Sequence, residues 1–545
     1  MPIVVVAVLF PICFYLFKIR GKGGSSLPND TLFENIGSDV ATLDPQQNGD
    51  NVSWRVILDL FEGLVGYDKN MHLVSTGAEN WTVSEDGLVY TFNLRKNAKW
   101  SNGLPVTADD YVYSYRRSVT PSTLTKYYIE QFMSIRNAKD IRSGDKGPES
   151  LGVYAVDDYT LKIEMEHPNP EFLDYLTMTA FFPIPQGCVE KYGLAWTNDG
   201  NIVSNGPYEL VQHISNGYID LKKSEFYWDK SNVSIPKVRF LMINDVSADY
   251  QSFVAGEEDI SYYKLPSKPI SEYEKIFNSS GKRRFFVYST LGQERIAFNF
   301  EREKFKDVRV RKAVYMLIDR QQLVDGVFRG ASVSYSPVPE NMCDKRFSDI
   351  YKKTDLSDFI ECSQDERNRK AQSLLLECGY SKEKPLVFEL AFPTGEIHKN
   401  MADLIQNMLN TNSNGLIECT LYFDEWKVFL QNMDDGKYEI FRSAWAADYN
   451  LSSSYTDLLV SHSSTNFGRY ANGEIDNLSA SSKVAQSIDK NLLLQDQIVI
   501  LAMNDCAVIP MVCTPALRLV SNRVNGFPEN NIINLSQSKW FNLEK

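Results

Sequence analysis

The first half of the chain places apolar and polar residues in short runs that are typical of β-strands. These runs mix β-branched and aromatic residues with polar ones and are bounded by turn residues. The clearest are Val89–Leu94, Leu161–Glu166 and Val238–Ile243. The pattern predicts a strand-rich first half.

After about residue 300 the apolar positions follow the period of a helix instead. Within residues 308–327, Val314, Leu317, Ile318 and Val324 fall on one stripe of a helical surface. The spacing predicts one helix over this range.

Strands and helices alternate from residue 368 onward. The expected order is a helix at Asn368–Cys378, a strand at Leu386–Phe392, a helix around Ile397–Met408, a strand at Leu416–Phe423, a helix at Asp424–Met433 and a strand at Tyr438–Trp445. Three strands with helices between them imply a mostly parallel sheet. Because open α/β sheets bind ligands beyond the carboxyl ends of their strands, His398 and Asp448 are expected to face one crevice.

The composition describes an acidic chain with enough apolar residues for several cores. Of its 545 residues 43% are hydrophobic, and 57 basic against 70 acidic residues leave a formal net charge of −13. At about 150 residues per domain, the length suggests three or four lobes. The acidic balance argues against nucleic acid and against an anionic membrane surface as partners.

The N-terminus carries a membrane signal. Ile3–Phe17 is a continuous apolar run, short for a membrane span and suited to a signal peptide. Lys18, Arg20 and Lys22 follow it, and the positive-inside rule would keep that flank in the cytoplasm. We nevertheless expect export, with Ile3–Phe17 either cleaved or kept as an anchor, and residues 21–28 as a flexible tether.

Signatures of the common catalytic and metal sites are missing from the sequence. Its five histidines show no zinc-ligand spacing, and no HExxH, GxxxxGK[ST], GxGxxG or GxSxG motif occurs. We therefore expect no catalytic residue, no metal and no cofactor. In an exported protein Cys343 and Cys362 either form a disulfide or are free thiols.

Several segments between residues 31 and 545 stand in an order that resembles a known family. They are Thr42–Pro45, Asp59–Leu64, Ala78–Tyr115, Asn205–Tyr208, Tyr227–Asp229, Gly256–Ile260, Phe305–Arg311 and Arg442–Asn450. Any short segment is weak evidence alone. Together they resemble the oligopeptide-binding branch of the solute-binding proteins that serve peptide importers.

This resemblance implies an α/β fold of the periplasmic-binding-protein type II-like kind. Such a fold is a clamp with three lobes that encloses its ligand between two hinged lobes. The leader and tether would occupy residues 1–30, lobe I would combine 31–65, 190–290 and 515–545, lobe II would be the insertion 66–189, and lobe III would be 291–514. The crossings near residues 290 and 514 would form the hinge.

The resemblance also implies a function. Proteins of this kind capture oligopeptides in an extended conformation, in the periplasm or at the outer face of the inner membrane. They deliver the peptide to the permease subunits of an ABC importer, and they are monomers and not enzymes. The alternatives are a murein (cell-wall) peptide as ligand, a nickel- or haem-binding relative, a peptidase or transferase on this scaffold, and an adhesin or signalling receptor.

Three residues are candidates for the charged ends of a bound peptide. The resemblance implies that Asp448 pairs with the α-ammonium of the peptide, because a charge that is buried when the clamp closes needs a partner. The alternative is a solvated loop carboxylate. Arg442 would meet the peptide carboxylate or order that end of the pocket, unless it pairs with a protein carboxylate. His398, at a helix N-terminus that favours anions, would reach the C-terminus of a longer peptide, unless it is an exposed or capping residue.

The peptide main chain needs a hydrogen-bonding edge. Ser443, Ala444 and Ala446 would supply it, because their small side chains permit close backbone approach. Trp445 between them would form a pocket wall or belong to the core.

A second edge is expected from Ser53, Trp54 and Arg55, which align with the family's second ladder strand. The family's basic, aromatic and cysteine pocket residues are not all retained. The positions that depart from the family pattern are Met433, Phe328 with Arg329 beside it, Val512–Thr514 and Ala447. These departures suggest a shifted preference for peptide length.

Overall fold

A computed structural model describes most of the chain. The described residues are 27–121, 129–262, 264–266, 268–279, 284–340, 342, 350–447, 449–463, 465–529 and 531–544. The apolar run Ile3–Phe17, Cys343 and Asp448 lie outside them, and Cys362 is a free thiol. Within the described ranges no helix is both long enough and apolar enough to cross a membrane.

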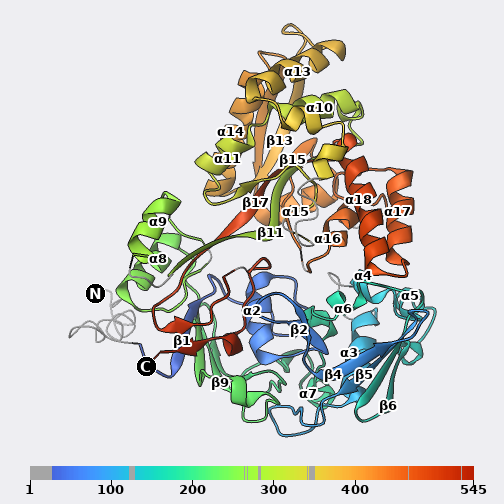
Figure 1. The fold of residues 1–545 in the computed structure, drawn as a ribbon, viewed down its shortest axis with the longest axis vertical. Helices are drawn as coiled ribbons and strands as arrows, with labels where there is room; N and C mark the ends of the chain where they lie inside the picture. The colour runs from blue at the N-terminus through green and yellow to red at the C-terminus, as the bar shows by residue number, and fades with distance from the viewer. Residues whose placement is uncertain are drawn as a thin grey trace, which may run out of the picture.

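The lower part of the molecule in Figure 1 contains two four-stranded sheets. One has the order β1 (Thr31–Asn35), β10 (Lys237–Leu241), β9 (Tyr218–Lys223), β8 (Tyr208–Ile214); the other has the order β4 (Ala78–Val83), β5 (Val89–Leu94), β7 (Thr160–Glu164), β6 (Val153–Asp157). The three strands predicted in the first half are therefore confirmed, with ends displaced by up to two residues.

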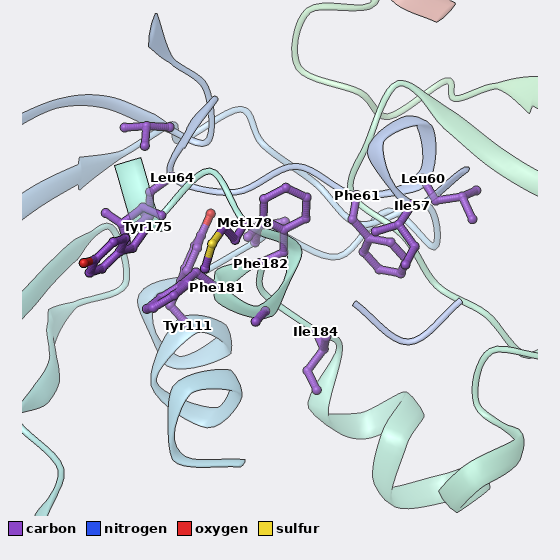
Figure 2. Close-up of a cluster of buried hydrophobic side chains, with 14 of the residues drawn as sticks. Ile57, Leu60, Phe61, Leu64, Tyr111, Tyr175, Met178, Phe181, Phe182 and Ile184 are labelled. Carbon is purple, nitrogen blue, oxygen red and sulfur yellow. The ribbon is translucent and has the colours of Figure 1, made fainter. Parts of the chain in front are cut away.

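One continuous core joins these two sheets. Helix α2 (Asn51–Leu60) contributes Ile57 and Leu60 to it, and α3 (Ala108–Val119) contributes Tyr111. Figure 2 shows these side chains in one cluster with Phe182. Because the cluster draws on distant parts of the sequence, the two sheets form one body.

The upper part is built on a seven-stranded mixed sheet. Its order is β12 (Ser332–Val333), β17 (Val508–Leu519), β11 (Phe285–Phe298), β15 (Ile440–Arg442), β13 (Leu386–Pro393), β14 (Ile417–Asp424), with β16 (Trp445–Ala446) paired to β11. β13 is parallel to β14 and β15, as the βαβ pattern predicts. The sheet as a whole is not mostly parallel. Its central strand β11 runs antiparallel to β15, β16 and β17.

Helices cover this upper sheet and extend to one side of it in Figure 1. They are α10 (Val308–Leu317), α11 (Arg320–Gly326), α13 (Gln364–Glu377), α14 (Glu396–Asn412), α15 (Trp426–Asp434), α17 (Gly473–Lys483) and α18 (Ile488–Asn504). α13 begins earlier than predicted because Ser363 and Glu366 form a capping box.

The single helix predicted over residues 308–327 is wrong. Ile318 adopts an extended conformation after α10, and Asp319 starts α11 by accepting hydrogen bonds from the backbone N–H groups of Gln321 and Gln322. A side chain that caps a new helix competes with continuation of the old one. The apolar stripe continues across the break, which is why periodicity alone did not reveal it.

The remaining elements are short or peripheral. They are α4 (Ile129–Phe132), α5 (Ala138–Ser143), α6 (Phe172–Tyr175), α7 (Gln186–Tyr192), α8 (Val246–Ala255), α9 (Ile270–Phe277), α12 (Ser357–Ile360), α16 (Ser453–Thr456), β2 (Val65–Tyr67), β3 (Leu73–Ser75), β18 (Val524–Asn525) and β19 (Asn542–Leu543).

Two long antiparallel strands, β11 and β17, run between the lower and upper parts (Figure 1). At one end Phe285 packs with Leu519 beside α8 and α9, and at the other Ile296 belongs to the upper core. The register shifts between the pairs Ser289–Pro515 and Gln293–Cys513. A shift of this kind bends a strand pair locally. The exact lobe limits expected from sequence stay a prediction.

Candidate functional site

A cavity of about 1020 Å³ is lined by residues of both the lower and the upper part. The lower part contributes Trp54 and Val246, and the upper part contributes His398 and Ala446. His398 follows β13 and Ala446 follows β15, so the cavity lies beyond the carboxyl ends of parallel strands. The predicted crevice is thereby confirmed for His398, whereas Asp448 is outside the described residues.

A buried ion pair forms part of the cavity wall. Arg442 of β15 lies opposite Ile296 of β11, and Glu294 stands two residues from Ile296 on the same face of the strand. Arg442 Nη2 is 2.6 Å from Glu294 Oε1, and its Nε is 2.8 Å from Oε2. The two side chains are only 10% and 9% exposed. Arg442 therefore lines the cavity but already pairs with a protein carboxylate, the alternative that the sequence left open.

His398 stands in the first turn of α14, as predicted, and lines the same cavity. Burial lowers the pKa of His398 to about 4; the positive charge of Arg442 acts in the same direction, and Glu294 opposes it. The imidazole is therefore neutral at pH 7. A neutral histidine offers one hydrogen-bond donor and one acceptor to a ligand and no charge.

The segment 443–446 hydrogen bonds to β11 along one side. Ala446 is paired with Gly292, and the N–H of Ser443 donates to the carbonyl of Arg295. Ala446 is exposed and lines the cavity, whereas Ser443 and Ala444 are half-buried and do not. The predicted strand Tyr438–Trp445 is thus two short strands with a break at 443–444.

Trp445 belongs to the upper core. Its ring is half-buried, packs against the upper hydrophobic cluster and is not among the cavity-lining residues. The carbonyl of Trp445 accepts a hydrogen bond from Tyr455 Oη at 2.8 Å. This packing agrees with the core interpretation of Trp445, and its part in a pocket wall stays a prediction.

The second ladder strand predicted at Ser53–Arg55 is also wrong, because these residues form the first turns of α2. Asp50 caps the helix by accepting a hydrogen bond from Ser53 N. The buried Ser53 Oγ donates to Asp50 Oδ2 and accepts from Ala41 N. Arg55 is buried in ion pairs with Glu34 and Asp59. Only Trp54 of the three reaches the cavity. A cap signal was present in the sequence and outweighs the alignment.

Several of the departures from the family pattern do line the cavity. Phe328 and Arg329 form part of its wall, as do Thr514 and Ala447. Met433, which belongs to α15, is instead buried in a separate cluster with Ala391 and Phe441 of the upper sheet. Besides Arg442, the cationic lining residues in the described part of the chain are Lys264, Lys268 and Arg329.

One buried carboxyl group links the lower and upper parts outside the cavity. Glu171 accepts hydrogen bonds from Tyr175 Oη at 2.5 Å, Ser453 Oγ at 2.9 Å and Asn491 Nδ2 at 3.0 Å. Burial raises the pKa of Glu171, since the charged form loses its hydration. Nothing in the local sequence around Glu171 marked it as a contact between distant segments.

The two-part architecture with a cavity between the parts defines a ligand-binding clamp of the periplasmic-binding-protein type II kind. The chain belongs to the bacterial extracellular solute-binding proteins, family 5, whose model matches residues 73–467. This family and its structural neighbours are substrate-binding proteins, not enzymes.

Three known proteins illustrate the relationship. The chain is 33% identical to the periplasmic oligopeptide-binding protein OppA of Haemophilus influenzae, over 90% of each chain. A crystal structure of Haemophilus influenzae OppA in complex with RPPGFSPFR has a TM-score of 0.80 at 31% identity, covering 95% of this chain and 99% of the other. The Escherichia coli murein tripeptide-binding protein MppA has a TM-score of 0.80 at 32% identity, covering 94% and 98%.

Proposed function

We propose that this chain captures peptides outside the cytoplasm, in an extended conformation, and delivers them to the permease subunits of an ABC importer. The observation that carries the proposal is the cavity of about 1020 Å³, whose wall includes the exposed Ala446 of the short strand β16, which is paired to β11 on one side. An extended peptide adds to such an edge through main-chain hydrogen bonds, each worth about 0.5–1.5 kcal/mol net. The relatives named for oligopeptide binding support the same assignment.

The amino end of the peptide would be held by Asp448. Its neighbour Ala447 lines the cavity, and its other neighbour, Tyr449, is buried against Tyr175 with ring centroids 5.1 Å apart. The carboxylate of Asp448 would balance the α-ammonium that every unmodified peptide carries.

A murein peptide is the second candidate ligand, because the murein tripeptide-binding protein matches this fold as well as the oligopeptide-binding protein does. Either ligand presents a free ammonium group to Asp448.

The protein would act as a monomer, exported or anchored by Ile3–Phe17. Alkaline phosphatase fused after Lys545 should be active, and activity of a cytosolic reporter alone would refute export.

The decisive experiment is a calorimetric double-mutant cycle. Asp448→Asn should weaken a free tripeptide by about 2–5 kcal/mol, the usual cost of breaking a buried charge pair. N-acetylation of the peptide should cost the wild-type protein a similar amount, and the two losses should not add. Asp435→Asn, an exposed carboxylate paired with Lys437, is the matched control and should change nothing. Additive losses would mean that Asp448 is structural.

A further inference from the structure

The buried pair of Arg442 and Glu294 changes what the cavity can accept. We propose that Glu294 makes this wall electrically neutral, so that Arg442 holds no ligand carboxylate. The site then selects peptides that present an uncharged group at this wall and extend past it. This inference rests on the proposed peptide-binding function and specifies which peptides the site takes.

The hydrogen-bonding geometry is the first argument. A guanidinium group recognises a carboxylate through two parallel N–H donors. In this structure Nε and Nη2 of Arg442 make that two-pronged contact with the two oxygens of Glu294, at 2.8 and 2.6 Å. The side-on pair of donors, Nε and Nη2, is therefore already used by a carboxylate of the protein, and a peptide C-terminus could meet only the remaining Nη hydrogens.

Charge is the second argument. A ligand carboxylate that approached Arg442 would also approach Glu294, and two neighbouring carboxylates repel one another. Glu294 is 9% exposed, so solvent screens this repulsion only weakly. Displacing Glu294 from Arg442 would leave a buried carboxylate without its partner, which is unfavourable in a site of this burial.

Two of the neighbouring groups, His398 and Lys268, add no unpaired positive charge to this wall. His398 has a pKa of about 4 and is neutral at pH 7. Lys268 lines the cavity from the lower part of the molecule, and its Nζ is 3.0 Å from Glu272 Oε1. The remaining lining cations, Lys264 and Arg329, come from other segments than Arg442 and are the groups that a peptide carboxylate would meet instead of it.

Glu294 is the residue that sets this property, and its position is specific. It lies on the cavity face of β11, diagonal to Arg442 across the strand pair. From this position its side chain contacts the guanidinium directly. An uncharged residue at the same place would leave Arg442 in the wall as a buried cation. Such a cation would need the carboxylate of a ligand.

Titration of wild type, Glu294→Gln and the double variant Arg442→Met/Glu294→Leu tests the inference. Each protein is titrated with tri-, tetra- and pentapeptides, as free acids and as C-terminal amides. Amidation should change affinity by the same factor in wild type and in the double variant, within about twofold. In Glu294→Gln the free acid should gain at least about tenfold over the amide at one peptide length.

The outcomes separate the two proposals. If wild type prefers free acids and the double variant loses that preference, Arg442 binds the carboxylate and the inference is wrong. If Glu294→Gln folds but shows no gain for free acids, the inference is wrong as well. If Glu294→Gln does not fold, the comparison of wild type with the double variant decides. If no peptide binds wild type, the proposed function fails and the inference fails with it.

Discussion

Replacing Arg55 by Met should destabilise the protein strongly without weakening the ligand complex. Arg55 Nη2 lies 2.7 Å from Glu34 Oε2, and Nη1 lies 3.0 Å from Asp59 Oδ2. The guanidinium also donates to Ser538 Oγ at 2.9 Å. All three charged side chains are at most 4% exposed. The substitution therefore leaves the buried Asp59 without its cation and leaves the buried Glu34 with only Arg518, whose Nη1 is 4.0 Å from Oε1.

The expected loss is about 3–5 kcal/mol of unfolding free energy near pH 7, the cost of breaking a buried pair from one side. Burial raises the pKa of Asp59 even though Arg55 opposes that shift, so removing Arg55 raises it further. Protonation then relieves the unpaired charge. Because the folded state of the variant binds protons more tightly, its deficit should shrink as the pH falls from 7 toward 5.

Urea denaturation followed by tryptophan fluorescence measures the effect. Arg239→Met is the matched control, since Arg239 pairs with Asp220 at 2.6 Å on the adjacent strand but the two are 36% and 22% exposed. Exposed pairs of this kind contribute about 0–1 kcal/mol. A loss for Arg55→Met no larger than that of the control would refute the reasoning. So would a loss of peptide affinity in the folded variant.

Two further predictions concern pH. Glu171, whose folded-state pKa is raised by burial, stabilises the contact between the two parts when protonated, so wild-type stability should fall as the pH rises through that pKa. Glu171→Gln should flatten this part of the profile of melting temperature against pH, whereas the control Glu149→Gln, at an exposed position, should not. Equal profiles for the two variants would contradict the role of Glu171 in the contact between the two parts. The His398 imidazole should titrate by NMR with a midpoint of about 4, and a midpoint above 6 would contradict its burial beside Arg442.

Local patterns in the sequence were enough to predict much of the fold. Val89–Leu94 has the predicted limits of its strand, because alternation and flanking turn residues act within a few positions. The unit from β13 to β15 is parallel as predicted, because one helix in each connection between three successive strands leaves few other topologies. That topology alone brought His398 to the cavity.

Predictions that relied on a distant partner were less successful. Ser53–Arg55 was expected to be a strand from alignment, yet the Asp50 cap makes it helical. That cap is a local signal, and the alignment did not take it into account. Trp445 was a candidate for the pocket wall or the core, and its ring packs against the upper core. This packing depends on which neighbours surround the segment, and a linear pattern does not contain that information.

By itself the sequence determined the class of protein, the parallel unit of the upper sheet and the edge of that sheet at which the cavity lies. Only the tertiary structure decided which charges meet: Arg442 with Glu294, 148 positions apart, and Arg55 with Glu34. The physical reason is that an ion pair is set by strand register and packing, which bring together side chains that share no local signal. The same register decides whether a cation in the cavity wall is available to a ligand.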